Sequence, residues 1–339
     1  MPKKVLVIGG AGYVGSSLVL KLLDEGHYVR VLDTFWFGDI DSIFGNYLTK
    51  HPLSAFRFCP FEGDIRSFDI ESIMGGMDVV IHLACISNDP SFELNPDLGR
   101  SINYDAFLRV IKAAQEKGIG RFIFASSSSV YGIKNEPEVT EELSLEPLTD
   151  YSKFKALCEN ELNMIPMGKL PWVIIRPATV CGYAPRLRLD LIVNILTISA
   201  LTKNKITVFG GSQQRPSIHI DDMADLYVQL VNEADKKVMG KTFNAGGSNY
   251  SVMNIAILVQ SVVQEYKKAK VSIEVHQTND PRSYRVSSAK IQRELGWQAR
   301  HSISDAVRSL VGAFNAGKIP DPENPRYYNI KTMQLLNVE

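Results

Sequence analysis

The chain has 339 residues, enough for one large domain or two lobes around a sizeable core. Its 37 basic residues balance 37 acidic ones, so no overall field attracts it to nucleic acid or to an anionic membrane. No apolar stretch is long enough to span a bilayer, and the four cysteines are widely spaced without a metal-ligand pattern. These features predict a soluble, cytoplasmic protein with reduced thiols and no metal site.

The chain begins with the pattern of a nucleotide-binding strand, turn and helix. A short apolar run at residues 5–8 leads into Gly9-Gly10-Ala11-Gly12-Tyr13-Val14-Gly15, and a helix follows with Val14, Leu18 and Leu22 on one face. The three spaced glycines permit a tight turn and let a diphosphate approach the backbone N–H groups at the positive end of the helix. The predicted cofactor contacts in this segment are Gly9, Gly12, Tyr13, Val14 and Gly15.

Asp33 ends a second expected strand at residues 28–32. A carboxylate at this place accepts hydrogen bonds from the adenosine ribose and repels the 2′-phosphate of NADP. The following residues 34–36 supply no arginine to neutralise such a phosphate. The alternative is an exposed acid after a tight turn, but the complete strand–helix–strand context favours NAD.

Alternation of strands and helices continues. Strands are expected at residues 55–59, 78–84 and 121–125, with a helix at 102–117 that ends at Gly118. This rhythm predicts an α/β fold with a Rossmann-type, doubly wound parallel sheet, whose ligand lies at the carboxyl ends of the strands. The loop residues expected beside the nucleotide are Asp64, Ile65, Leu83 and Ala84.

Tyr151 and Lys155 are four residues apart and therefore share a face if they lie on a helix. An ammonium beside a phenol favours the phenolate, so we expect the Tyr151 pKa to fall from its free value of about 10. Tyr151 would then be a general base for a hydroxyl group. The alternative is an ordinary amphipathic helix. The serine run at 126–129 follows the strand at 121–125, and its place before Tyr151 favours the catalytic interpretation.

Taken together, these motifs, with Gly63-Asp64-Ile65, His82-Leu83-Ala84 and Val130-Tyr131-Gly132, resemble the extended short-chain dehydrogenases/reductases of the nucleotide-sugar epimerase/dehydratase group. The resemblance extends to about residue 315. It implies that Ser127 hydrogen-bonds the reacting sugar oxygen, that Tyr151 exchanges the proton and that Lys155 also holds the nicotinamide ribose. Asn103 matches an asparagine of the family and is expected near the cofactor, although asparagine also suits a helix cap.

The resemblance also implies a site for a nucleotide-diphosphate sugar. Thr179 stands where the family usually has asparagine, so one substrate hydrogen bond is altered. Arg215 and Arg282 match the two arginines that grip the diphosphate, a role that suits a fork-shaped guanidinium. Arg186 and Arg188 are additions that could bind a diphosphate or a sugar substituent, or form surface salt bridges. The predicted substrate residues are Ser128, Thr179, Arg186, Arg215 and Arg282.

Asp221 and Asp222 could suggest a metal site, but acidic residues also stabilise the first turn of a helix, which we expect here. The predicted domain boundaries divide the chain into three parts. A NAD-binding domain covers 1–176 with a return near 217–247, a smaller α/β substrate-binding lobe covers 177–216 and 248–318, and 319–339 form a C-terminal tail, which is expected to be extended over 320–328.

The predicted function is a nucleotide-sugar 4-epimerase that passes through a 4-keto sugar and uses tightly bound NAD. Dehydratases of this group carry Asp-Glu after the catalytic residue, and decarboxylases carry Glu in the second place. Here Ser128 and Ser129 stand there, which counts against elimination. A one-way 4-dehydrogenase or ketoreductase remains open, and a dinucleotide sensor is disfavoured by the intact Ser127, Tyr151 and Lys155. The resemblance further implies a homodimer formed by helices near 102–117 and 151–163, with Leu157 and Leu162 as candidate contacts.

Overall fold

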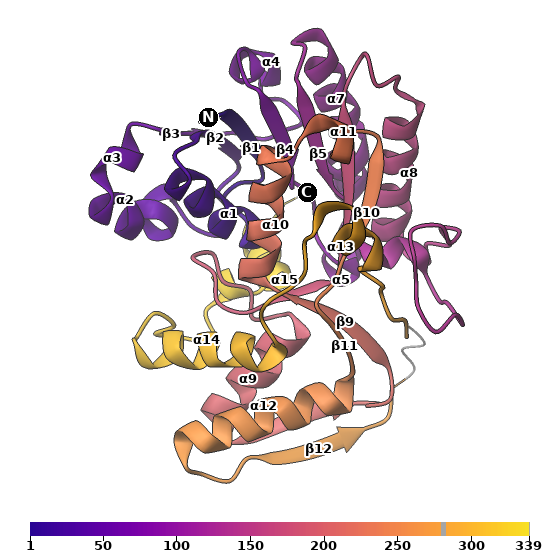
Figure 1. Cartoon of the computed structure of the whole chain (residues 1–339). Coiled ribbons are helices and arrows are strands. Elements are labelled where there is room, and N and C mark those ends of the chain that lie inside the picture. Colours follow the sequence, from indigo (N-terminus) through magenta and orange to yellow (C-terminus); the bar gives the residue numbers. More distant parts are fainter. Residues whose placement is uncertain (279–282, 339) are drawn as a thin grey trace.

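The computed structural model describes residues 1–278 and 283–338. Seven strands form one sheet in the order β10-β6-β5-β4-β1-β2-β3, and every neighbouring pair is parallel. The strands are β1 (Lys4–Ile8), β2 (Tyr28–Asp33), β3 (Phe58–Glu62), β4 (Val79–His82), β5 (Arg121–Ala125), β6 (Trp172–Pro177) and β10 (Lys241–Ala245). The predicted Rossmann-type, doubly wound α/β fold is therefore confirmed (Figure 1).

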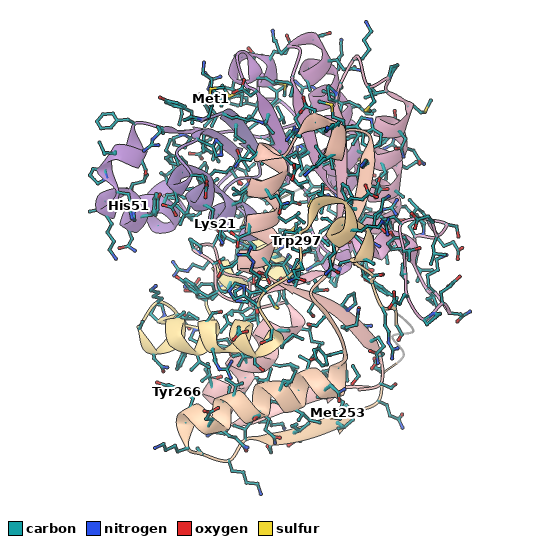
Figure 2. All side chains as sticks on the ribbon, in the orientation of Figure 1. Met1, Lys21, His51, Met253, Tyr266 and Trp297 are labelled. Carbon is teal, nitrogen blue, oxygen red and sulfur yellow. The ribbon has the colours of Figure 1, made fainter. Side chains whose placement is uncertain are left out.

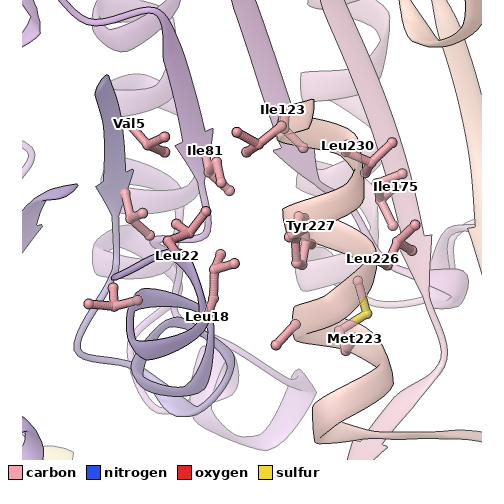
Figure 3. Packing of buried hydrophobic residues seen from close by; sticks show 14 of the residues in the cluster. Val5, Leu18, Leu22, Ile81, Ile123, Ile175, Met223, Leu226, Tyr227 and Leu230 are labelled. Carbon is pink, nitrogen blue, oxygen red and sulfur yellow. The ribbon is translucent and has the colours of Figure 1, made fainter. Parts of the chain in front are cut away.

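Helices cover both faces of this sheet, as its fully buried strands require. On one face, α1 and α10 pack on alternate strand residues such as Val5, Ile81 and Ile123 (Figure 3). On the other face, α4, α7 and α8 pack on the residues that point the opposite way, such as Leu6 and Phe122. The five helices are α1 (Tyr13–Asp24), α4 (Ile70–Met74), α7 (Ala106–Glu116), α8 (Asp150–Met164) and α10 (Ile220–Asn232).

An ion pair joins the two helices of the first face at their exposed edge. The Lys21 ammonium on α1 contacts the Asp225 carboxylate on α10 and lies 3.9 Å from that of Asp221 (Figure 2). Asp221 and Asp222 both lie in the first turn of α10, so the expected helix start is confirmed. Asp222 is buried and accepts hydrogen bonds from the backbone N–H groups of Arg300 and His301, which ties a distant loop to this helix.

The remaining elements form smaller sheets and a helical layer beside the carboxyl edge of the large sheet (Figure 1). Strands β11-β9-β7 form one small sheet and β12-β8 another. Their bounds are β7 (Thr179–Cys181), β8 (Lys205–Phe209), β9 (Gln214–His219), β11 (Ser248–Ser251) and β12 (Ser272–His276). Three long helices share a separate core with them, namely α9 (Ile192–Lys203), α12 (Val252–Lys267) and α14 (Ile303–Asn315). Met253 and Tyr266 mark the two ends of α12 (Figure 2).

Short helical turns complete the chain. They are η1 (Asp41–Gly45), α2 (Asn46–Lys50), α3 (Pro52–Ala55), α5 (Asp89–Glu93), α6 (Pro96–Arg100), η2 (Ser101–Asp105), η3 (Ser128–Tyr131), α11 (Asp235–Val238), α13 (Ala289–Leu295), η4 (Pro325–Tyr327) and α15 (Asn329–Leu335). Within the described residues, no helix combines the length and apolar character that crossing a membrane requires.

Two sequence-based expectations about these elements were wrong. The third strand begins at Phe58, not Ala55, because Pro52 occupies the first turn of a short helix that takes up residues 52–55. Residues 320–328 are not extended throughout, since they contain the turn η4, and the helix α15 follows them. Apolar residues explain this folding, because Tyr327 and Met333 are both buried against the rest of the protein.

A buried polar network anchors α8 to the sheet. Glu159 on α8 is fully buried and forms a two-pronged ion pair with Arg176 on β6, with Arg176 Nη2 2.6 Å from Glu159 Oε2 and Nε 3.0 Å from Oε1. Arg176 Nη1 donates to the Tyr131 hydroxyl at 2.7 Å, and that hydroxyl donates to Asn244 Oδ1 at 2.7 Å. The Ser126 hydroxyl also donates to Glu159. Four separated segments are thereby held together by charge-assisted hydrogen bonds.

We expect Glu159→Ala to lower the free energy of unfolding by about 3–5 kcal/mol, because it leaves the Arg176 guanidinium buried without its carboxylate. Urea denaturation followed by circular dichroism measures this loss. Glu265→Ala is the matched control, since Glu265 is an exposed glutamate on helix α12 and its removal should change stability by no more than about 0.5 kcal/mol. Equal effects of the two substitutions would contradict an anchoring role for Glu159.

Candidate active site

A cavity of about 960 Å³ opens along the carboxyl edge of the large sheet and extends towards the smaller sheets. This is the edge at which a doubly wound sheet binds its ligand. Among the predicted site residues, those that line the cavity are Gly9, Gly12, Tyr13, Val14, Gly15, Asp33, Asp64, Ile65, Leu83, Ala84, Ser127, Ser128, Tyr151, Lys155, Thr179, Arg186 and Arg215. Arg282 lies outside the described residues, and Asn103 lies behind the cavity wall.

The glycine turn has the geometry of a diphosphate cradle. Gly9 has φ +84°, and a Cβ added there would lie 2.5 Å from the backbone nitrogen of Ala84. A Cβ on Gly15 would lie 2.3 Å from the Gly9 carbonyl oxygen, so α1 approaches the turn as closely as only glycine allows. Gly12 caps α1 without a side-chain hydrogen bond, which leaves the first N–H groups of the helix directed at the cavity. The cradle therefore fits the diphosphate of a dinucleotide.

Asp33 at the end of β2 holds the turn as well as facing the cavity. Its carboxylate accepts hydrogen bonds from the backbone N–H groups of Ala11 at 2.8 Å and Phe35 at 3.0 Å. Burial raises the pKa of this carboxyl, and the two N–H groups and the Arg186 guanidinium oppose that rise. Each carboxylate oxygen keeps a lone pair for the ribose hydroxyls of an adenosine.

Asn103 acts on the loop after β4. Its side-chain oxygen accepts from the Ile86 N–H at 2.8 Å and its amide donates to the Ile86 carbonyl at 3.0 Å. Asn103 lies inside the turn η2 and is not a helix cap. The side chain therefore fixes the loop that carries Leu83 and Ala84 along the cavity, and its predicted place near the cofactor stays a prediction.

The three predicted catalytic residues come together at the ends of β5 and α8. Tyr151 and Lys155 lie on one face of α8, as their spacing predicted. Ser127 caps the turn after β5, and its side chain is close enough to Tyr151 to lower the pKa of that phenol. Lys155 is buried, and its ammonium donates to the Ala125 carbonyl at 2.6 Å. All three side chains line the same cavity.

The expected fall of the Tyr151 pKa is not found in this protein environment. Burial raises the pKa of the phenol, as do the nearby Cys85 and Asp89, while the hydrogen bond from Ser127 and the charge of Arg188 lower it. The Lys155 ammonium is directed to the Ala125 carbonyl, so the helical spacing alone did not determine where its charge acts. The phenol is therefore neutral at physiological pH unless a further positive charge approaches it.

Tyr131, a second tyrosine near the serine run, does not line the cavity and so does not compete with Tyr151 as a base. Its side chain is fully buried, and its hydroxyl is engaged by Arg176 and Asn244. Burial raises the pKa of Tyr131 to about 12, and the charge of Arg176 opposes that rise. Tyr131 thus belongs to the network beneath the site.

The remaining predicted substrate residues come from the turn after β5 and from the small sheet. The Ser128 hydroxyl is 3.4 Å from that of Tyr284, Thr179 is on β7, and Arg215 is on β9 with a guanidinium hydrogen bond to the Gln214 carbonyl. Arg186 lies on the cofactor side instead, close to Asp33. Among the polar side chains that line the cavity and that the sequence analysis missed are Ser87, Asp89, Asp190 and Asn329. No motif marks them, since their neighbours come from distant parts of the chain.

We expect Asp33→Ser to relax the preference for NADH over NADPH by at least about tenfold, which corresponds to about 1.4 kcal/mol. The reason is that the Asp33 carboxylate faces the ribose position and repels a 2′-phosphate. Fluorescence titration of both reduced cofactors measures the ratio of dissociation constants. Thermal melting of the variant controls for loss of the hydrogen bonds to Ala11 and Phe35. Equal affinity of the unmodified protein for both cofactors would refute the assignment.

Comparison with known proteins agrees with this geometry. The model of the NAD dependent epimerase/dehydratase family matches residues 5–246. An uncharacterized UDP-glucose epimerase, YtcB of Bacillus subtilis, is 30% identical over 315 residues, covering 91% of this chain and 96% of that protein. A UDP-glucose 4-epimerase of Lactobacillus helveticus is 27% identical over 331 residues, covering 90% of this chain and 94% of that protein.

The structural likeness extends over the same length. The crystal structure of UDP-glucuronic acid 4-epimerase from Bacillus cereus, in complex with UDP-glucuronic acid and NAD, superposes with a TM-score of 0.79 at 26% identity. The match covers 92% of this chain and 99% of that one. With the glycine cradle, Asp33 and the Ser127–Tyr151–Lys155 cluster in place, the chain belongs to the NAD-dependent epimerase/dehydratase family.

Proposed function

We propose that the protein is a nucleotide-sugar 4-epimerase with UDP-sugars as its substrates. The observation that carries this proposal is that Ser127, Tyr151 and Lys155 converge in the same cavity that also holds the dinucleotide cradle. The choice of uridine as the nucleoside, and of the sugar, is taken from the relatives, which are named as epimerases of UDP-glucose and UDP-glucuronic acid.

In this proposal Tyr151 takes the proton of the sugar C4 hydroxyl and later returns it to the same oxygen. Ser127 holds that oxygen by a second hydrogen bond, which orients the hydroxyl towards the phenol. NAD held by the glycine cradle and Asp33 would supply the hydride acceptor for C4, and its positive charge would favour the Tyr151 phenolate. Lys155 keeps the Tyr151 face of α8 directed at the sheet and offers its remaining N–H groups to the nicotinamide ribose.

The acid–base groups of the cavity favour epimerisation over elimination. The two residues after Ser127 are serines, of which Ser128 is paired with Tyr284. An elimination needs a separate acid and base next to the sugar, and neither of the two residues directly after Ser127 carries a carboxylate. Net epimerisation leaves the oxidation state unchanged, so the site must retain its cofactor between the two half-reactions.

The substrate is proposed to lie between the large sheet and the smaller sheets. Thr179 and Arg215 are on strands β7 and β9 of one small sheet, while Ser127 and Ser128 follow β5 of the large one. We place the nucleotide diphosphate against Arg215 and the sugar beside Ser128 and Thr179, while the predicted role of Arg282 stays a prediction from the sequence. The predicted domain boundaries, with a return to the NAD-binding part near 217–247, stay part of this proposal.

The function is tested by incubating the purified protein with UDP-, dTDP-, GDP- and CDP-sugars and identifying products by NMR. We expect interconversion of C4 epimers of at least one UDP-sugar without added redox co-substrate. Net formation of NADH would favour the dehydrogenase alternative, and conversion of none of these sugars would refute the proposal.

Tyr151→Phe should lower turnover by about a hundred- to ten-thousand-fold, the usual contribution of general acid–base catalysis, with NADH binding nearly unchanged. Ser127→Ala should cost a comparable factor. Since the pKa of Tyr151 is raised, the phenolate is scarce at neutral pH, and turnover of the unmodified enzyme should rise as pH increases. Tyr104→Phe is the matched control, because Tyr104 hydrogen-bonds Glu161 at 2.8 Å on the outer side of α8 and does not line the cavity. Near-full activity of Tyr151→Phe would refute the mechanism.

We also propose a homodimer in which α7 and α8 pack on their copies. Leu157 is 40% exposed on α8 and is available for this contact, whereas Leu162 is fully buried within the subunit and is not. Light scattering at micromolar concentration should give twice the subunit mass. Leu157→Glu should weaken the dimer by placing a charge in the contact, while Ile257→Glu, at an exposed position on α12, should not. A monomeric unmodified protein would contradict the proposal.

A further inference from the structure

The C-terminal segment, residues 319–338, folds across the cofactor side of the cavity. In Figure 1 its helix α15 lies between the large sheet and the lower helices. The Leu189 N–H donates to the Tyr327 carbonyl at 2.8 Å, and Met333 joins the apolar core on the α8 side of the sheet. Tyr328, Asn329 and Met333 all line the cavity. Neither the proposed chemistry nor the family motifs give this segment a role.

Asn329 connects the segment to two other parts of the chain. Its backbone N–H donates to Asp190 at 3.0 Å, and its side-chain amide donates to the Ser87 hydroxyl at 3.0 Å. Its side-chain oxygen accepts from Arg186 Nη2 at 2.6 Å, across 143 residues of sequence. The side chain is 4% exposed. A single buried amide thus joins the loop after β4, the loop after β7 and the C-terminal segment.

Arg186 is a buried cation in the wall of the cavity. It is 4% exposed and lines the cavity, and within residues 1–278 and 283–338 its guanidinium forms no ion pair with a carboxylate. Nε has no hydrogen-bond partner among these residues. Burial lowers the pKa of Arg186 to about 9 and the nearby Arg188 adds to this, while the carboxylates of Asp190 and Asp33 oppose the fall without forming an ion pair with it. A guanidinium kept charged in such a place calls for an anionic ligand.

The position of Arg186 indicates which anion this is. Its backbone N–H donates to the Ser16 hydroxyl on α1 at 3.2 Å, and its guanidinium lies 3.8 Å from the centre of the Phe37 ring beyond β2. It is close enough to Asp33 and Tyr13 for its charge to lower the pKa of both groups. Asp33 marks the place of the adenosine ribose and Tyr13 the cradle for the diphosphate. Arg186 therefore spans the cofactor cleft between these two places.

We propose that Arg186 binds the diphosphate of NAD from the side opposite the glycine cradle, and that Asn329 of the C-terminal segment positions it there. The diphosphate is then held between the N–H groups of α1 and a guanidinium, and the segment covers it. Such an arrangement slows the dissociation of the cofactor. Slow dissociation is needed in an enzyme whose reduced cofactor must return the hydride to the sugar that supplied it. Nothing in this inference depends on which sugar is the substrate.

The test measures nucleotide binding to protein stripped of its cofactor, by calorimetry with ADP-ribose, adenosine and NADP. Arg186→Met should weaken ADP-ribose binding by roughly ten- to hundredfold, the cost of one charge-assisted contact, and leave adenosine binding within about threefold. Arg186→Lys should restore part of the loss. Asn329→Ala should weaken ADP-ribose binding less and should lower the amount of NAD that copurifies with the protein. Arg326→Met is the matched control, since Arg326 is an exposed arginine of the same segment that does not line the cavity.

Three results would overturn the inference. They are an unchanged affinity of Arg186→Met for ADP-ribose, an equal loss for adenosine and ADP-ribose, and a loss confined to NADP. If Arg186→Met does not fold, the affinities of Arg186→Lys and Asn329→Ala for ADP-ribose and adenosine are compared in the same way to test the inference. Because no sugar is present in these measurements, their outcome is independent of whether the protein epimerises any substrate.

Discussion

The ion pair between Glu159 and Arg176 is the interaction on which the proposed active site depends. Tyr151, Lys155 and Glu159 follow one another at four-residue intervals, so they form one stripe of α8 that faces the sheet. Glu159 fixes this stripe to β6, and Lys155 fixes it to the Ala125 carbonyl at the end of β5. Because Lys155 and Glu159 are both bonded to strands, rotation of α8 about its axis would break these contacts. The Tyr151 phenol is thereby held beside Ser127.

Fixing a helix by a buried ion pair costs free energy, since both ions lose their hydration. Its advantage here is geometric, because a guanidinium and a carboxylate meet in one plane and at one register. The same network occupies Tyr131 and explains why one of two tyrosines near the serine run faces the cavity and the other does not. We interpret the pair as specifying the position of α8 more than adding to stability.

The residues around the cofactor cleft also fall into two groups, those that are neighbours in the sequence and those that are far apart in it. The glycine cradle and Asp33 come from one continuous segment, and Asp33 itself ties the turn together through Ala11. The opposite wall is assembled from residues 87, 186, 190 and 329, which meet only in the folded chain. An enzyme that ends each cycle with its cofactor unchanged gains from such a two-sided enclosure, whereas an enzyme that exchanges its cofactor every turnover would be slowed by it.

Features that depend on neighbouring residues were therefore predictable from the sequence. Apolar runs, the glycine spacing and the position of Asp33 predicted the parallel sheet and the cofactor turn, because each acts through backbone geometry within a few residues. Only the tertiary structure decided the rest. It directed Lys155 to a carbonyl, raised the Tyr151 pKa by burial, placed Arg186 beside Asp33 and folded the C-terminal segment over the cleft. These outcomes depend on packing and desolvation between segments far apart in the chain, on which local patterns carry no information.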